Sequence, residues 1–422
     1  MKIEFPYEGI EPLEIPDGRA MGVIGPRDAR PAAPPATIMA RALRNPIGSP
    51  RLRDLACRAR RALILCDDNT RPTPIAQVLP WLLEELHAHN PALEVAFLIA
   101  SGTHRPMTAQ EKEQKLSAEV LRAYPVFDHR WDDTSMLADL GHTPLGAPVQ
   151  VNRALLEADL IIGVGHVAPH RMAGFGGGGK IVQPGVCGAV TTGRTHWAAA
   201  QFETAELMGR AENAVRAEME SAAAVAGLKA IVNVVLNTRN EIVGCFCGEP
   251  VAAHRAACQL AEEVYRGDLP GLADIVVIES YPSDLDLWQA SKALAASEIA
   301  VKPHGVVILV APCPEGVSCE HPAFLDYGYR SPAEVADWVS SGAMTDLIVA
   351  AELAIGGRVI KERAKGIMVS TGITAEAIRQ LGLTPAASPQ EALDMAFHLT
   401  GQDARVLVVR HGGEILPIVH AH

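Results

Sequence analysis

The residues of this chain with the clearest chemical potential lie in one run, Gly163–Trp197, which reads GVGHVAPHRMAGFGGGGKIVQPGVCGAVTTGRTHW. It contains His166, His170 and His196, and it places Lys180 directly after four glycines. Histidine transfers protons near neutral pH and binds metal ions through a ring nitrogen, and a lysine amine can form covalent bonds. Because the run contains few side chains able to build a core, we expect it to serve chemistry rather than packing.

The glycines before Lys180 fit two phosphate-binding patterns incompletely. The G-x-G-x-x-G match lacks an acidic residue after a second strand, and the P-loop match lacks a Ser or Thr after the lysine, where Ile181 stands. Glycines still allow backbone N–H groups to approach a phosphate closely. Two interpretations therefore stay open for Gly176, Gly177, Gly178 and Gly179: a phosphate cradle or a structural turn.

The histidines also fit a metal site. His166 and His170 are four residues apart, as in helical zinc motifs, but Pro169 and the neighbouring glycines disfavour a helix there. His196 can bind a metal through one ring nitrogen or cap a helix. A zinc-type metallohydrolase using these three histidines and His104 is one alternative function, and a non-catalytic nucleotide-binding protein is another.

Two further polar runs directly follow predicted strands. Asp68, Thr70 and Arg71 follow the first, and His104 follows the second. The Arg71 guanidinium is suited to a carboxylate or phosphate, Asp68 can orient that arginine or hold a ribose hydroxyl, and His104 is a candidate acid or base. Later in the chain, Gln289 and Lys292 are three apart at a predicted helix start, so they share a face and can reach one anion together.

Strands that alternate with helices must position these residues. Short apolar runs followed by helical patterns predict strands at 62–66, 94–100, 159–164, 231–236, 275–279, 306–311, 366–370 and 405–409. The pattern is typical of a doubly wound α/β protein with mainly parallel sheets. In such sheets ligands lie beyond the carboxyl ends of the strands, where the polar runs stand. We also predict one helix over 203–226 and capping boxes at Thr108/Glu111 and Ser388/Glu391.

The length of 422 residues exceeds one ordinary core. The breakers in GDLPGL, at 267–272, favour an N-terminal domain over 1–270 and a C-terminal α/β domain over 271–422 that closes an active-site cleft, with the last strand free to return to the first domain. A net charge of -12 disfavours a nucleic-acid surface. The N-terminus lacks the pattern of a signal peptide and no long apolar stretch occurs, so we expect a cytoplasmic location and no membrane partner. The eight cysteines lack zinc-site spacing, and we interpret them mostly as buried thiols.

In series, these elements resemble the nickel-dependent lactate racemase family. The resemblance spans nearly the whole chain, through DNTR at 68–71, SGTHR at 101–105, Pro169-His170, the glycines with Lys180, Thr195-His196 and Gln289-x-x-Lys292. It implies an isomerase that inverts C2 of a 2-hydroxy acid, with a nickel-pincer nucleotide as cofactor and the proteins that synthesise this cofactor as partners. It implies nothing about the oligomeric state.

The resemblance also implies residue roles. Lys180 would hold the nucleotide covalently and His196 would complete the nickel coordination, with further cofactor contacts from Asp68, Thr70 and Gly176–Gly179. His104 and His170 would act as acid and base, and the substrate carboxylate would be held by Arg71, Gln289 and Lys292. Hydride transfer to an electron-poor acceptor, through a 2-keto acid, avoids removal of a weakly acidic C2 proton next to a carboxylate.

One departure bears on the substrate. Trp288 stands where the lactate enzymes are expected to carry a smaller tyrosine, so we expect a larger acid, with an aromatic, branched or polyhydroxylated side chain, as readily as lactate. His166 has no role in this scheme.

Overall fold

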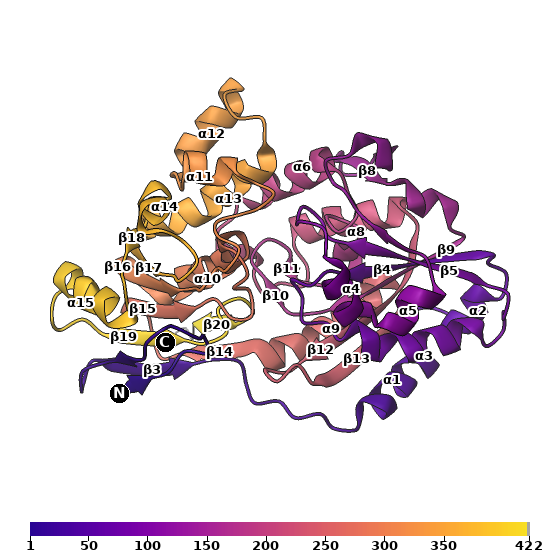
Figure 1. Ribbon diagram of the computed structural model, residues 1–422, viewed down its shortest axis with the longest axis horizontal. Helices are drawn as coiled ribbons and strands as arrows, with labels where there is room; N and C mark the ends of the chain where they lie inside the picture. Colours follow the sequence, from indigo (N-terminus) through magenta and orange to yellow (C-terminus); the bar gives the residue numbers. More distant parts are fainter. Residues whose placement is uncertain (420–422) are drawn as a thin grey trace.

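The chain folds around two six-stranded sheets, one in each lobe of the molecule (Figure 1). This computed structural model describes residues 1–419. The first sheet has the order β13 (Ile242–Gly248), β12 (Leu228–Leu236), β9 (Leu160–His166), β4 (Arg61–Asp67), β5 (Glu94–Ala100) and β6 (Val126–Asp128), and only β13 is antiparallel to its neighbour. The second sheet is parallel throughout, in the order β18 (Thr384–Pro385), β17 (Ala364–Val369), β16 (Val301–Val310), β15 (Ala273–Glu279), β19 (Val406–Val409) and β3 (Ala20–Ile24). Both the predicted α/β class and every predicted strand are confirmed.

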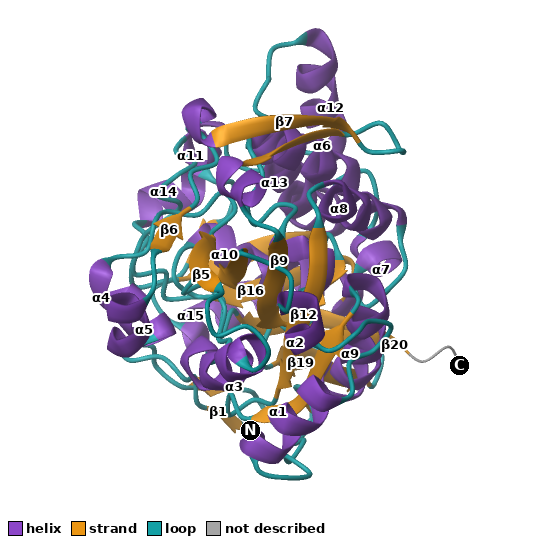
Figure 2. Ribbon diagram, turned by 90° about the vertical axis from the view of Figure 1, so that its right-hand side faces the viewer, coloured by secondary structure: helices purple, strands orange, loops and turns teal. Residues whose placement is uncertain are grey.

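Helices cover the sheets (Figure 2). Those in the first part of the chain are α1 (Pro35–Arg44), α2 (Leu52–Ala56), α3 (Ile75–His87), α4 (Ala109–Leu116), α5 (Ala118–Ala123), α6 (Ala189–Ala199), α7 (Thr204–Leu207), α8 (Ala214–Val225) and α9 (Pro250–Tyr265). Those in the second part are α10 (Leu287–Ala300), α11 (Ala323–Tyr327), α12 (Pro332–Ser341), α13 (Leu347–Gly357), α14 (Ala375–Gln380) and α15 (Pro389–Thr400). Short paired strands complete the fold: β1 (Lys2–Ile3) with β2 (Leu13–Glu14), β7 (Leu137–His142) with β8 (Pro148–Asn152), and β10 (Pro169–His170) with β11 (Gly174–Phe175).

Alternate residues of the central strands enter opposite cores. In β4, Ile64 and Cys66 pack into the core under α3, whereas Leu63 and Leu65 pack into the core on the other face. Side chains of a strand point to alternate faces, so a sheet covered on both sides needs apolar residues at every position. This burial explains why the predicted strands read as continuous apolar runs, and it fixes the position of the loops that follow them.

The two ends of the chain each pair with a strand that is distant in the sequence. Strand β3, near the N-terminus, pairs with β19 and forms the edge of the second sheet, so Ala20–Ile24 contribute to that sheet and not to the first. At the other end, β20 (Leu416–Val419) pairs in parallel with β14 (Arg266–Leu269), just before the predicted boundary. Both ends of the chain are therefore tied to strands that lie far from them in the sequence. The domain boundary at residue 270 stays a prediction.

The predicted helix over 203–226 is wrong as one element. The structure has two helices there, α7 and α8, separated by a turn with Gly209 at φ +76°. The Asn213 side chain accepts a hydrogen bond from the Arg216 N–H and so starts α8 afresh. The capping box at Thr108 and Glu111 is confirmed. At Ser388 only half of the box forms, because the Glu391 carboxylate accepts from the Ala387 N–H instead.

Candidate active site

The polar runs after three neighbouring strands meet at one edge of the first sheet. Strands β9, β4 and β5 are adjacent and parallel, and they end at His166, Asp67 and Ala100. Because the carboxyl ends of parallel strands lie together, the following loops converge, as the sequence predicts. Helix α10 of the second lobe reaches the same place.

A cavity of about 120 Å³ lies between the two lobes at this edge. Eleven of the thirteen predicted site residues line it: Asp68, Thr70, Arg71, His104, His170, Gly176, Gly177, Lys180, His196, Gln289 and Lys292. The other two, Gly178 and Gly179, do not. The cavity also has His166 and Glu414 in its lining. Motifs that are far apart in the sequence thus line one cavity, and both lobes contribute to it.

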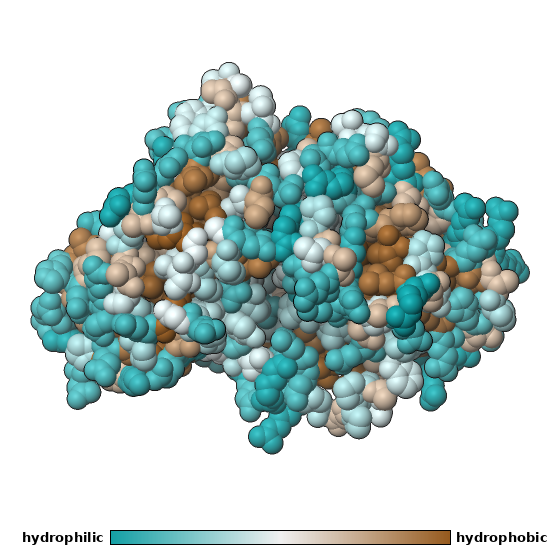
Figure 3. All heavy atoms as spheres, in the orientation of Figure 1, coloured by the Kyte–Doolittle hydropathy of each residue, from teal (hydrophilic) through white to brown (hydrophobic). Residues whose placement is uncertain are grey.

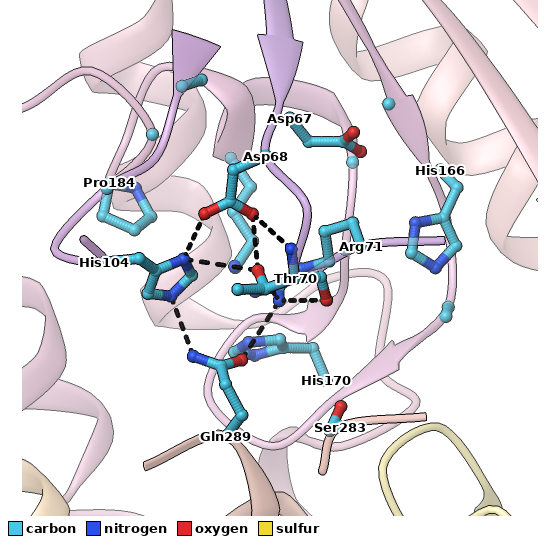
Figure 4. Close-up of a pocket in the computed structure, with 18 of the residues that line it drawn as sticks. Asp67, Asp68, Thr70, Arg71, His104, His166, His170, Pro184, Ser283 and Gln289 are labelled. Atoms are coloured by element: carbon cyan, nitrogen blue, oxygen red, sulfur yellow. Dashed lines mark hydrogen bonds and ion pairs between the residues drawn. The ribbon is translucent and has the colours of Figure 1, made fainter. Parts of the chain in front are cut away.

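His104 is held between a carboxylate and an amide (Figure 4). Its Nδ1 lies 2.6 Å from Asp68 Oδ2, and its Nε2 lies 3.0 Å from the Gln289 amide nitrogen. A carboxylate accepts and an amide nitrogen donates, so the neutral ring carries its proton on Nδ1 and a lone pair on Nε2. His104 is therefore arranged as a base toward the cavity.

Asp68 is tied down by its own loop. Its second oxygen accepts hydrogen bonds from the backbone N–H and the hydroxyl of Thr70. Burial alone would raise the pKa of the Asp68 carboxyl, but His104, Arg71 and these hydrogen bonds together hold that pKa below its ordinary value. Asp68 is thus a fixed negative charge that selects one tautomer of His104 and stabilises its protonated form.

His170 has the opposite hydrogen bonding. Its Nδ1 accepts from the backbone N–H groups of Met172 and Ala173, at 3.2 and 3.3 Å. The neutral ring therefore carries its proton on Nε2. Burial, reinforced by the charges of Lys180 and Lys292, lowers the pKa of His170 well below its ordinary value. His170 is a neutral group with a proton to share.

Gln289 shows where an anion fits. Its Oε1 accepts hydrogen bonds from Lys292 Nζ at 2.6 Å and from Arg71 Nη1 at 3.2 Å. Burial, together with the charge of Arg71, lowers the pKa of the Lys292 amine well below its ordinary value. An oxygen held between a guanidinium and an amine marks a position that a carboxylate oxygen would occupy more favourably, because its charge offsets the repulsion between the two cations.

Lys180 and His196 line the same cavity from two elements. Lys180 lies on a short turn of 3₁₀ helix, Gly178–Ile181, and its amine makes no hydrogen bond or ion pair with the part of the chain that the structure describes. Burial, with the charges of Arg71 and Arg216, lowers the pKa of this amine well below its ordinary value. His196, on α6, has Nδ1 2.9 Å from the Thr192 carbonyl oxygen. Nδ1 therefore donates, and Nε2 keeps a lone pair that can bind a metal.

The glycine run is shaped by packing. Gly177 and Gly178 have φ angles of +69° and +59°, in the left-handed region. A Cβ on Gly178 would lie 2.8 Å from the His254 ring, and one on Gly179 would lie 3.1 Å from α8. The Gly178 N–H is already bound by Asn233. The lack of a side chain at Gly178 and Gly179 lets the loop lie against α8 and α9, and the predicted cofactor contact of these two glycines stays a prediction.

Sequence reasoning missed the residue that holds this loop. Arg216, fully buried on α8, donates to the backbone carbonyl groups of Ala173, Phe175 and Gly177. Burial lowers the pKa of its guanidinium to about 10, which leaves it charged at neutral pH. No local signal marked Arg216, because its partners lie about 40 residues earlier in the chain.

His166, which had no role in the sequence scheme, takes part in a structural contact between the lobes. Its Nε2 lies 3.2 Å from Glu414 and its Nδ1 lies 3.2 Å from the Thr73 hydroxyl. Both ring nitrogens are thus engaged. Within residues 1–419, no group of three or more His, Cys, Asp or Glu side chains is arranged to hold a metal. Catalytic zinc sites use three protein ligands, so the zinc-hydrolase interpretation has no support here.

The surface and the cysteines add little to the functional argument. Hydrophilic side chains dominate the face seen in Figure 3. Among the described residues, none of the helices combines the length and the apolar character needed to cross a bilayer. All eight cysteines are free thiols, and most are buried, as predicted.

Comparisons with known proteins agree with the motifs. A family model described as the lactate racemase N-terminal domain matches residues 8–208, and one described as the lactate racemase C-terminal domain matches residues 270–416. The chain is 30% identical over 421 residues to the lactate racemase of Thermoanaerobacterium thermosaccharolyticum, covering 98% of each chain. It is also 30% identical over 392 residues to that of Lactiplantibacillus plantarum, covering 88% of each.

Solved structures show the same fold. The lactate racemase apoprotein of T. thermosaccharolyticum superposes with a TM-score of 0.88 at 30% identity, over 99% of this chain and 100% of that one. A protein from Thermotoga maritima, 21% identical, superposes with a TM-score of 0.73 over 89% of this chain and 100% of that one, and shares the fold. With two family models that together match most of its length, the chain belongs to the lactate racemase family.

Proposed function

We propose that this protein is an isomerase that inverts C2 of a 2-hydroxy acid, with a nickel-pincer nucleotide held by Lys180 and His196. The observation that carries the proposal is the meeting of four elements in one cavity: an unpaired lysine amine, a metal-competent imidazole, two histidines in opposite tautomers and a paired cationic clamp. Each element is common alone, but this combination suits the inversion of a hydroxylated carbon next to a carboxylate.

The side chains present fit the cofactor. The lowered pKa of Lys180 favours the neutral, nucleophilic form of its amine, which a covalent attachment needs. Burial is the main cause that lowers the pKa of His196 to about 3, so its Nε2 lone pair stays available to a metal. Because residues 1–419 contain no group of three or more metal ligands, the other nickel ligands would come from the nucleotide itself. When bound, the cofactor supplies an acceptor that takes a hydride from C2 and returns it.

The histidines manage the hydroxyl proton. His104 Nε2 accepts the proton of the C2 hydroxyl once the substrate replaces the Gln289 amide, and Asp68 stabilises the resulting imidazolium. His170 serves the opposite enantiomer. When its ring is protonated, it gives its Nε2 proton to the C2 oxygen in place of the proton that His104 has taken, and exchange with solvent then returns both rings to their starting protonation states. A substrate carboxylate beside Arg71 and Lys292 offsets part of the charge that lowers the pKa of His170, which helps that ring to take up a proton.

The cationic clamp keeps the substrate in place. The carboxylate takes the position that Gln289 Oε1 now fills between Arg71 and Lys292, which frees the Gln289 amide to donate to the bound acid. A 2-keto acid held at its carboxylate can then turn its carbonyl group from one histidine to the other without leaving the closed cavity.

The experiment that tests this proposal is expression with the proteins that synthesise the cofactor, followed by intact-mass measurement and a polarimetric screen of single-enantiomer 2-hydroxy acids. We expect a mass increase in the wild type and in Lys292→Met, which keeps the attachment residue. The increase should disappear in Lys180→Ala. An unmodified wild-type mass together with absent inversion would favour a nucleotide-binding protein instead.

A further inference from the structure

A second, smaller cavity adjoins the active site. It shares Thr70, Thr103, His104, Trp288 and Gln289 with the larger cavity. Its volume is about 20 Å³, and a cavity of about 10–15 Å³ already holds one water molecule. In this closed arrangement it therefore has room for a group the size of a hydroxyl and not for a phenyl ring or a branched alkyl chain.

His321 lines this second cavity with unused hydrogen-bonding capacity. The residue is 3% exposed. Neither ring nitrogen meets the geometry of a hydrogen bond within the described chain, although the Thr103 backbone approaches the ring and favours its charged form. Its ring stacks on Trp288, with centroids 4.1 Å apart, and Trp131 lies on it at 5.3 Å. Because Trp288 covers one face of the ring and Trp131 lies tilted against it, the ring edge with its nitrogens is the part best placed to contact a ligand. A buried polar group without a partner costs free energy that a bound ligand can recover.

The chemistry of His321 selects the kind of group that it can bind. Burial lowers the pKa of this histidine to about 4, so the ring is neutral at pH 7 and offers one donor and one acceptor. A hydroxyl group can pair with either nitrogen, because it can donate to the lone pair or accept from the N–H. An alkyl group would leave both nitrogens unpaired, and a carboxylate would find no donor opposite the ring's acceptor nitrogen.

Charge also excludes a second carboxylate. The cationic side chain of this cavity, Arg105, is already bonded to Glu111 and to Glu315. Asp286 and Glu320 add further acidic groups to the lining or its rim. The surroundings of His321 are therefore acidic overall, and a dicarboxylic acid would be repelled.

Resting on the proposed isomerase function, we propose that the preferred substrate is a short hydroxylated 2-hydroxy acid, such as a three- or four-carbon sugar acid, whose C3 or C4 hydroxyl bonds to His321. The carboxylate lies at Arg71 and Lys292, C2 lies at the histidine pair, and the side chain passes His104 and Gln289 into the second cavity. His321 is then a specificity-determining residue. This narrows the sequence expectation, because the aromatic and branched acids do not fit the space.

The test compares acids that differ by one group: glycerate and threonate against lactate, with malate and phenyllactate as the charged and bulky alternatives. On cofactor-loaded enzyme, we expect kcat/KM for glycerate or threonate to exceed that for lactate by about tenfold or more, since a site built to bond a hydroxyl rejects the analogue that lacks it. Malate and phenyllactate should be poorer than lactate. Equal or higher kcat/KM for lactate, malate or phenyllactate would overturn the inference.

The variant His321→Phe keeps the ring stacking and removes both nitrogens. We expect the ratio of kcat/KM for the hydroxylated acid to that for lactate to fall about tenfold, and His321→Asn, which restores a donor and an acceptor, to recover part of it. A merely structural His321 would lower both values together and leave the ratio unchanged, which would overturn the proposal. If the enzyme modified at Lys180 inverts lactate and shows no preference for hydroxylated acids, only this inference is refuted. If the protein shows no mass adduct and inverts no acid, the proposed function is refuted as well.

Discussion

His104 and His170 border the same cavity from contrasting surroundings. His104 is bonded to a buried carboxylate and presents a lone pair, whereas His170 lies among cations, accepts two backbone N–H groups and presents a proton. Identical side chains thus acquire different protonation preferences from their neighbours. The protonation preference of each histidine is therefore set by the hydrogen-bond partners and charges next to its ring, and variants that change these groups test the difference.

The largest expected effect comes from removing either ring. His104→Ala and His170→Ala should each lower kcat by about 10²–10⁴-fold, the usual contribution of a positioned acid or base. Both variants should still show the mass adduct on Lys180, because neither side chain is part of the attachment. Full activity in both variants would break the assignment, and loss in only one would mean that a single histidine serves both enantiomers.

A smaller effect is expected behind His104. Asp68→Asn keeps the shape of the side chain but removes the charge that selects the tautomer and stabilises the protonated ring, so kcat should fall about 10²-fold. The neighbouring Asp67→Asn is the matched control, since Asp67 contacts Lys115 and Thr73 rather than His104. Comparable losses of activity at equal thermal stability in the two variants would contradict a special role for Asp68.

The tautomers themselves can be observed without turnover. In cofactor-free protein at pH 7.5, the ¹⁵N shifts of labelled histidine rings should show the proton on Nδ1 in His104 and on Nε2 in His170. Spectra of His104→Gln and His170→Gln provide the assignments. The same tautomer in both rings would remove the basis of the comparison.

The smallest expected effect is on the free energy of unfolding, at a buried histidine that has no catalytic role. Burial lowers the pKa of His129, away from the active-site cavity, to about 4. Since the unfolded chain binds this proton near pH 6.5, the contribution to stability is full above pH 6.5 and is lost as the pH falls toward 4. His129→Gln should therefore reduce the drop in unfolding free energy between pH 7.5 and pH 5 by about 2 kcal/mol. Denaturant titrations at both pH values measure it, and exposed His142→Gln, expected to change the drop far less, is the control. An unchanged drop in His129→Gln would mean that burial does not govern this group.

The sequence was most informative where function depends on local order. Strands β4, β5 and β9 are recognisable in the sequence as apolar runs. Because polar residues that follow adjacent parallel strands lie close together, Asp68 and His104 could be predicted to be neighbours. What escaped prediction depends on distant contacts. Arg216 bonds to carbonyl groups of a loop on another segment, and β3 joins the second sheet only because β19 offers an edge.

Two features of the site depend on packing that a local sequence pattern does not encode. Gly178 and Gly179 follow a phosphate-binding pattern, yet their glycine character is explained by the approach of α8 and α9, which no local pattern encodes. His321 carries no motif at all, and only its burial between two tryptophans makes its unpaired nitrogens conspicuous. Packing between the lobes therefore determines which polar side chains keep hydrogen-bonding groups that are free to bind a ligand.

The central claim is that C2 is inverted by moving a hydride rather than a proton, and the fate of the C2 hydrogen tests it most directly. Cofactor-loaded enzyme is incubated in D₂O with one enantiomer of a 2-hydroxy acid carrying protium at C2, and the inverted product is analysed by NMR. We predict that the product keeps its protium at C2, because the hydride does not exchange with solvent while the histidines exchange only the hydroxyl proton. Deuterium at C2 in step with inversion would contradict the account.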